Sequence, residues 1–193
     1  MKSYTCIFFI MFSSFTYAEN PSEAIAKKQS DSELSIMGFT IGKSTLLDVQ
    51  AKFKSKDIYK EGDAGSSTSL LCYKSSNGSI IAFESGEMGG ESHIINSISI
   101  HSSSNPYRLS KICEKTSLIK TKLALNGISL GMSSDLITKL KGKPSKQSSN
   151  SILYHFEVQE KNGSASVDIM SDFNIELNQN AVSALSASKV ESN

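Results

Sequence analysis

The stretch that most resembles a chemical motif runs from residue 38 to residue 45 and reads GFTIGKST. A loop that binds nucleotide phosphates has four residues between its first glycine and the Gly-Lys pair, because that length lets backbone N–H groups curl around the phosphates. Here only three residues separate Gly38 from Gly42. The loop is one residue short, so we do not expect this stretch to bind a nucleotide.

An acidic pair is the next candidate. Glu157 and Asp168 flank Asn162-Gly163, a dipeptide that predicts a tight β-hairpin turn. A two-residue turn there places Glu157 opposite Asp168 and puts both on one face with His155. Like charges across a strand pair are destabilising. One interpretation is a polar surface that receives a Lys or Arg of a partner. The alternatives are a shifted register, or a nearby lysine such as Lys161 together with ordinary solvation.

The same pair is a poor candidate for catalysis, because an exposed sheet face offers little desolvation to separate two pKa values. The chain has three histidines, and no Cys/His cluster has the spacing of metal ligands. Neither a serine-hydrolase elbow nor a zinc-protease motif occurs. We therefore expect no catalytic residues, no metal and no cofactor.

A glycine-rich acidic loop at residues 86–91 is a further candidate for contact with a partner. Glu87 and Met88 lie at its tip, and apolar anchors on loops often concentrate the energy of an interface. The alternative interpretation is a flexible strand connection.

The first eighteen residues have the pattern of a secretory signal peptide. One lysine precedes an apolar run, and a polar stretch ends in Thr16, Tyr17 and Ala18. The apolar run is too short to span a bilayer permanently. We expect cleavage after Ala18 and a periplasmic or secreted mature protein that is not inserted in the membrane. A buried N-terminal helix is the alternative.

Two cysteines, Cys72 and Cys113, remain after the signal peptide is removed. An even number in an exported chain predicts a disulfide, and two unpaired buried thiols are the alternative. The sequence has 20 Lys and Arg against 19 Asp and Glu, and Arg108 is the only arginine. This charge balance argues against nucleic acid as a partner.

An internal match organises the rest of the chain. GFTIGKSTLLDV at 38–49 aligns with GISLGMSSDLIT at 127–138, with glycines and a serine in common. Each copy is typical of a short extended segment, a glycine turn and a capped amphipathic helix, with Ser44, Ser133 and the Thr45-x-x-Asp48 pattern as capping candidates.

After each helix the apolar pattern changes to the alternation of strands, and three strands are predicted in each copy. The predicted fold is therefore α+β, with two tandem helix-plus-three-stranded antiparallel sheet repeats at 38–101 and 127–193. A connector at 102–126, with some helical spacing, joins them, and a polar segment at 19–37 precedes them.

The pattern G-[IF]-x-[IL]-G-[KM]-S followed by a short helix and three strands resembles the small domain of the outer-membrane assembly lipoprotein family BamE/SmpA. Its duplication resembles the beta-lactamase inhibitory protein fold, in which two such units form one curved sheet. The resemblance implies a non-enzymatic module that binds another protein, such as an inhibitor or immunity-type protein acting by surface occlusion. A BamE-like accessory of envelope assembly and a weak hydrolase are the alternatives.

Overall fold

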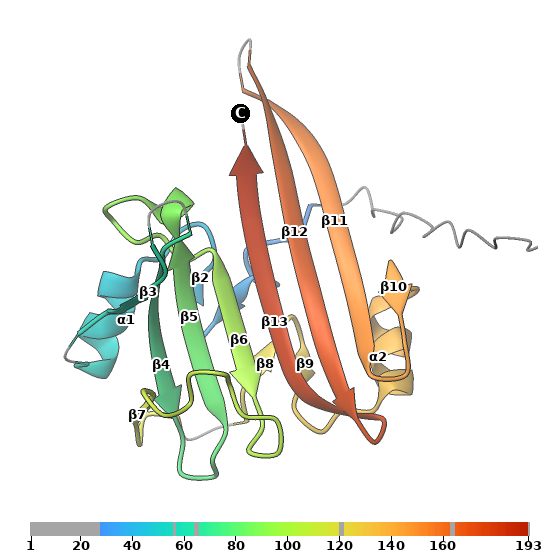
Figure 1. Cartoon of the computed structure of the whole chain (residues 1–193). Coiled ribbons are helices and arrows are strands. Elements are labelled where there is room, and N and C mark those ends of the chain that lie inside the picture. The colour runs from blue at the N-terminus through green and yellow to red at the C-terminus, as the bar shows by residue number, and fades with distance from the viewer. Residues whose placement is uncertain (1–27, 56, 64–65, 120–121, 163–164, 193) are drawn as a thin grey trace, which may run out of the picture.

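The structure is a computed structural model of the chain and describes residues 28–55, 57–63, 66–119, 122–162 and 165–192 (Figure 1). The predicted signal peptide, its cleavage point after Ala18 and residues 19–27 of the polar segment lie outside these residues. Among the described residues, no helix has the length and apolar character needed to cross a membrane.

A nine-stranded sheet dominates the molecule, and it joins strands from both halves of the chain. Its order is β10-β11-β12-β13-β6-β5-β4-β3, with neighbours antiparallel, and β7 lies parallel to part of β4. The bounds are β3 (Tyr59–Glu61), β4 (Thr68–Lys74), β5 (Ile80–Gly86), β6 (Ser97–His101), β7 (Glu114–Lys115), β10 (Lys146–Gln147), β11 (Ser151–Asn162), β12 (Ala165–Asn178) and β13 (Ala181–Ser192).

The predicted fold class of two tandem helix-plus-three-stranded repeats is wrong. The described chain is mostly β, with two short helices and one large sheet. The two halves merge where β13 pairs with β6, from Ala184 opposite His101 to Ser188 opposite Ser97. A three-stranded unit on its own would leave the edge of β6 unpaired, and this pairing removes that edge.

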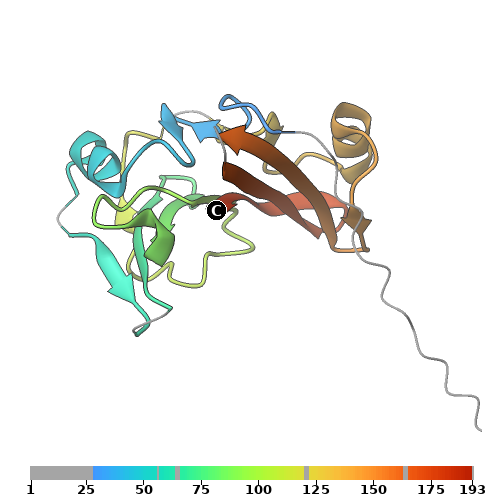
Figure 2. The ribbon, with the colours of Figure 1, turned by 90° about the horizontal axis from the view of Figure 1, so that it is seen from above.

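Both helices lie on one face of the sheet (Figure 2). They are α1 (Leu46–Phe53) and α2 (Ser134–Lys141). Thr45 caps α1 with a complete capping box, in which its side chain accepts from the Asp48 N–H and Asp48 accepts from the Thr45 N–H. Ser133 occupies the N-cap of α2 without a side-chain cap bond, and Gly142 ends that helix.

Two small hairpins precede the helices on the same face. They are β1 (Ser35–Ile36) with β2 (Phe39–Thr40), and β8 (Ala124–Leu125) with β9 (Ile128–Ser129). The matched glycines hold corresponding positions after them. Gly42 has φ +79° and donates to the Ile95 carbonyl at 2.8 Å, while Gly131 has φ +80° and donates to the Val182 carbonyl at 2.8 Å. The stretch that resembles a phosphate loop is therefore a turn that connects a hairpin to a helix and to the sheet.

The main core lies between this face of the sheet and the helices and hairpins. Phe53 of α1 stacks on Tyr73 of β4 with 3.9 Å between ring centroids, and Phe39 meets Phe83 edge to face at 5.2 Å. The two halves share the core continuously. Its fully buried members include Leu46, Val49, Ile81, Ile98, Ile100, Leu125, Ile128, Ile137, Ile152, Phe173 and Ile175.

A second, smaller cluster lies on the opposite face and covers only the first half of the sheet. Tyr107 of the connector packs against Leu70, Cys72, Ile80 and Ala82. The predicted disulfide is confirmed, since Cys72 and Cys113 are bonded with an S–S distance of 2.07 Å. The connector does not form the helix suggested by its apolar spacing. Its described residues form turns, the short strand β7 and, near its end, β8.

Candidate functional site

The connector leaves the second half of the sheet uncovered on the face opposite the helices. Figure 1 views this face, and the connector crosses in front of β4, β5 and β6, whereas no described segment crosses in front of β11, β12 and β13. We call the uncovered surface of β6, β13, β12 and β11 the open face. A sheet face normally needs a covering layer when it is apolar, so the residues of the open face must be compatible with water.

Small hydroxyl side chains form the middle of the open face. Ser99 of β6 lies opposite Ser186 of β13, and Ser97 lies opposite Ser188. These two pairs sit at the joint between the halves of the chain. Ser99 is buried beside His101, and the other three serines are half-buried. Because those three side chains are small, the backbone of the sheet is close to the surface there, and a flat partner can approach it.

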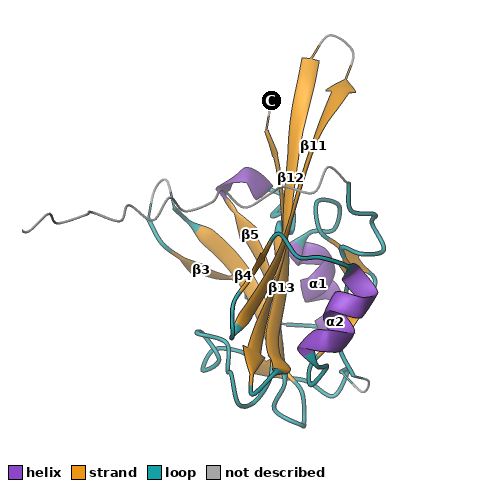
Figure 3. Cartoon of the chain, turned by 90° about the vertical axis from the view of Figure 1, so that its right-hand side faces the viewer, coloured by secondary structure: helices purple, strands orange, loops and turns teal. Residues whose placement is uncertain are grey.

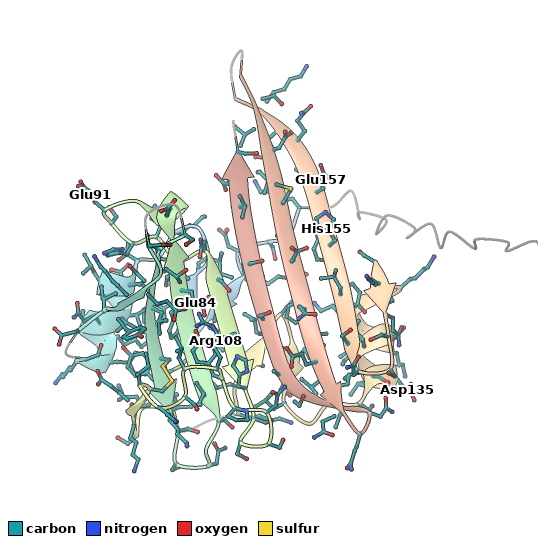
Figure 4. The ribbon with its side chains drawn as sticks, viewed as in Figure 1. Glu84, Glu91, Arg108, Asp135, His155 and Glu157 are labelled. Atoms are coloured by element: carbon teal, nitrogen blue, oxygen red, sulfur yellow. A yellow bond between two sulfur atoms is a disulfide. The ribbon has the colours of Figure 1, made fainter. Side chains whose placement is uncertain are left out.

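One row across the sheet brings together the polar groups at the two sides of this serine block. In register, the row contains His155 of β11, Asp172 of β12, Ser188 of β13, Ser97 of β6 and Glu84 of β5. At one side of the row are the His155 imidazole and the Asp172 carboxylate. At the other side is the partly buried carboxylate of Glu84. Figure 4 shows His155 on β11 and Glu84 near Arg108 on opposite sides of this strip.

The connector side of the open face is rigidly built. The Tyr107 hydroxyl donates to the Glu84 carboxylate, and burial together with this hydrogen bond raises the pKa of Tyr107 well above its usual value. Arg108 forms an ion pair with Glu61, and the disulfide holds Cys113 against β4. These contacts fix the connector as a wall of the open face.

His101 ends β6 beside this wall. Its Nε2 lies 3.1 Å from the Ser99 hydroxyl, its ring is 5.1 Å from that of Tyr107, and its buried Nδ1 has no hydrogen-bond partner among the described residues. Burial lowers the pKa of His101, because a charged imidazole loses its hydration there. The ring is therefore neutral at pH 7 and serves packing.

The other side of the open face is an acidic rim on β11 and β12. The Nδ1 of His155 lies 2.6 Å from the Asp172 carboxylate, and its Nε2 lies 3.9 Å from Glu157. A carboxylate can only accept, so Nδ1 carries the proton of this bond. Asp168 accepts from the Gln159 amide at 2.7 Å. The rim thus offers carboxylate oxygens to a cationic group of a partner.

The predicted pairing of Glu157 with Asp168 does not occur. Glu157 lies opposite Met170, and Gln159 lies opposite Asp168, because the strands close at Asn162 opposite Ala165. The register differs from the expected one by two residues. Since side chains alternate with a period of two, this shift leaves His155, Glu157 and Asp168 on the predicted common face while it separates the two acids.

An apolar pair lies beside the acidic rim. Met170 of β12 and Val190 of β13 are in register on the open face, and their exposed fractions are 37% and 38%. Met170 is the cross-strand neighbour of Glu157, and Val190 follows in the same row on the next strand. The sequence contains a signal for Met170, since strand alternation from Asp168 and Asp172 assigns it to the same face.

The glycine-rich loop lies apart from the rim, at the other side of the molecule in Figure 4, where Glu91 and Glu157 are labelled. Glu87 starts the short 3-10 helix η1 (Glu87–Gly89) and is exposed, whereas the side chain of Met88 lies outside the described residues. The loop packs closely against neighbouring residues at Gly89. A side chain at Gly89 would meet the Ser85 hydroxyl at 2.0 Å and the Ile94 carbonyl at 2.7 Å.

A cavity of about 1150 Å³ lies at the end of β4, away from the rim of the open face, and was not suggested by the sequence. Lys74 and Lys115 are in register in the parallel pair of β4 and β7, and Lys122 adds a third cation. The cavity is a positively charged surface hollow with Ile119, Leu123 and Leu130 in its lining. Among the described residues no group of three or more His, Cys, Asp or Glu side chains is placed to hold a metal ion.

The chain matches no protein-family model, no curated protein and no solved structure. The resemblance to the BamE/SmpA family and to the beta-lactamase inhibitory protein fold therefore stays a hypothesis that rests on the residues alone.

Proposed function

We propose that the protein is an exported, non-enzymatic module that binds another protein on the open face and acts by covering a surface of that partner. The observation that carries the proposal is the uncovered half of the sheet, with its serine block between a fixed wall and an acidic rim. Its inhibitor or immunity-type action would require no covalent chemistry.

The partner's chemistry follows from the rim. Glu157 and Asp172 favour a lysine or arginine, because a charged donor forms the strongest hydrogen bonds with a carboxylate. The adjacent Met170 and Val190 favour an apolar or aromatic contact beside that cation. A partner surface with a basic residue next to an apolar one fits both groups, while its flat remainder lies on the serine block.

The rigid wall supports binding without a large entropic cost. Tyr107, Arg108 and Cys113 each have a fixed contact with β3, β4 or β5. A surface whose side chains are already ordered loses less conformational freedom when a partner binds. The disulfide is also consistent with export, since disulfides persist in oxidising compartments.

The test is capture of a partner with a matched pair of variants. The chain from residue 19 is immobilised and exposed to periplasmic extract, culture supernatant and solubilised envelope of its source. Ser186→Arg places a long charged side chain in the serine block, and Lys139→Glu changes an exposed residue of α2 on the far side of the sheet.

We expect one soluble protein to be retained stoichiometrically by the wild type and by Lys139→Glu, and to be lost with Ser186→Arg. Addition of the wild-type chain in increasing amounts should then inhibit the activity of the retained protein. Retention of envelope-assembly components would contradict the inhibitor form of the proposal. Equal retention by the wild type, Ser186→Arg and Lys139→Glu would contradict the open face as the binding site.

A further inference from the structure

The outer edge of β11 is only partly paired. β10 pairs with it at Leu153 and Ile152, and the Ser145 hydroxyl accepts from the His155 N–H at 2.9 Å. From Glu157 to Lys161, no described residue forms a backbone hydrogen bond with this edge. Figure 3 shows that this part of β11 and β12 extends beyond the helices.

The alternation of hydrogen bonds identifies which groups are unpaired. Leu153 and His155 direct their backbone groups toward the edge, where the residues around β10 bond them. Every second residue does the same, so Glu157, Gln159 and Lys161 direct N–H and C=O groups outward. Such a row of groups is a template for another strand. By contrast, the edge strand at the other end of the sheet, β3, has three residues.

We propose that this edge pairs with the same edge of a second copy of the chain, antiparallel and around a two-fold axis at Gln159. Gln159 then lies opposite Gln159 of the second copy, and Glu157 lies opposite Lys161 of the second copy. Three hydrogen-bonded residue pairs would give about six backbone hydrogen bonds. The dimer does not require the partner protein proposed above, but both proposals use Glu157, and in the dimer Asp172 is the rim carboxylate left for that partner.

Charge complementarity selects this register. Glu157 and Lys161 are exposed and point to the same face, and Lys161 has no ion pair among the described residues. In the proposed register both charges of each copy meet an opposite charge. Residues whose backbone N–H and C=O groups point outward must lie opposite each other. The two neighbouring registers that satisfy this condition have the two-fold axis at residue 160 or at residue 158. One of them places Glu160 opposite its own copy, and the other places Glu157 opposite Gln159.

Charged residues on an edge strand often prevent pairing with another strand. They would do so here if the antiparallel arrangement placed like charges opposite each other. Here the order Glu157, Gln159, Lys161 is complementary to its own reverse. A two-fold axis perpendicular to the sheet also leaves the two open faces on the same side. The dimer would therefore present a continuous surface of twice the size.

The experiment is sedimentation velocity over a concentration series with the chain from residue 19. We expect a dimer for the wild type. Lys161→Glu places carboxylates opposite each other at two symmetric contacts and should weaken the dimer about tenfold or more. Lys161→Glu combined with Glu157→Lys restores opposite charges and should restore the dimer. Lys139→Glu on α2 makes the same change in net charge elsewhere and should leave the dimer unchanged.

Gln159→Pro tests the backbone contact separately. It removes an N–H that points out of the sheet, so the monomer should keep its circular dichroism spectrum while the dimer is lost. A wild type that stays monomeric through the series overturns the proposal. A dimer that is insensitive to Lys161→Glu, or that the charge exchange does not restore, overturns it as well.

Discussion

At the scale of single residues, the wall of the open face is held by polar groups that are nearly removed from water. Tyr107 is 5% exposed and donates to Glu84, while His101 lies beside its ring with one nitrogen bonded to Ser99. Burying a polar group is costly unless it is hydrogen-bonded, so these contacts define one arrangement of the connector. The sequence contained the residues but no pattern that joins them, because they meet only through tertiary packing.

Removal of the Tyr107 hydroxyl should destabilise the fold. Tyr107→Phe leaves the Glu84 carboxylate without its donor, and we expect the free energy of unfolding to fall by about 1–3 kcal/mol. Urea denaturation provides the measurement. Tyr59→Phe, at a side chain that is 41% exposed, is the matched control and should change little. Equal effects of the two variants would contradict the role of the buried contact.

His101 should make stability depend on pH below neutrality. Burial lowers the pKa of His101 in the folded chain, so the unfolded chain binds a proton more readily. The contribution of His101 is complete above its unfolded value of about 6.5 and is lost as pH falls below it. His101→Gln should therefore lose less stability than the wild type between about pH 7 and pH 5. Parallel pH profiles in urea denaturation would refute this account.

At the scale of elements, the sequence predicted what is local. The capping pattern at Thr45, the position of Ser133 at a helix N-cap and the disulfide are all in the structure, because each is determined by a few neighbouring residues or by a pair of cysteines. The register of β11 with β12 was predicted wrongly by two residues. Asn162 lies in the strand and not in the turn, and the dipeptide pattern alone does not distinguish these positions.

The two helix N-termini provide a matched prediction. Thr45→Ala removes the hydroxyl that accepts from the Asp48 N–H, while the Thr45 backbone N–H can still donate to Asp48, and we expect the free energy of unfolding to fall by about 1 kcal/mol. Ser133→Ala at the N-cap of α2 removes a side chain that makes no cap bond, so its effect should be within about 0.5 kcal/mol. Thermal or urea unfolding of both variants checks the difference, and a larger loss for Ser133→Ala would contradict it.

The disulfide should stabilise the fold substantially. Cys72 and Cys113 close a loop with a sequence separation of 41, which corresponds to about 4 kcal/mol in the chain-entropy model. We expect the Cys72→Ala, Cys113→Ala double variant to unfold at a clearly lower urea concentration than the wild type. If the midpoint were unchanged, the disulfide would not be what holds the connector against β4.

At the scale of the whole molecule, the result that the sequence could not show is the merging of two halves into one sheet. The joint between β13 and β6 pairs serines on the open face and buried apolar residues, Leu185 with Ile100 and Ala187 with Ile98, on the other face. The two strands are 80 or more residues apart in the chain. The short strands such as β7 and β10 have two residues each and leave no periodic pattern. The residue patterns therefore define strands within each half but not which strands of the two halves pair, and only the resemblance to the beta-lactamase inhibitory protein fold suggested one curved sheet.

The claim that the open face binds a partner is tested most directly by the affinity of the captured protein for two variants. Isothermal titration with the wild type, Ser186→Arg and Lys139→Glu measures it, with circular dichroism to verify that each variant is folded. We expect Ser186→Arg to weaken binding by about tenfold or more and Lys139→Glu to bind as the wild type does. A folded Ser186→Arg variant that binds with wild-type affinity would contradict the open face as the binding surface.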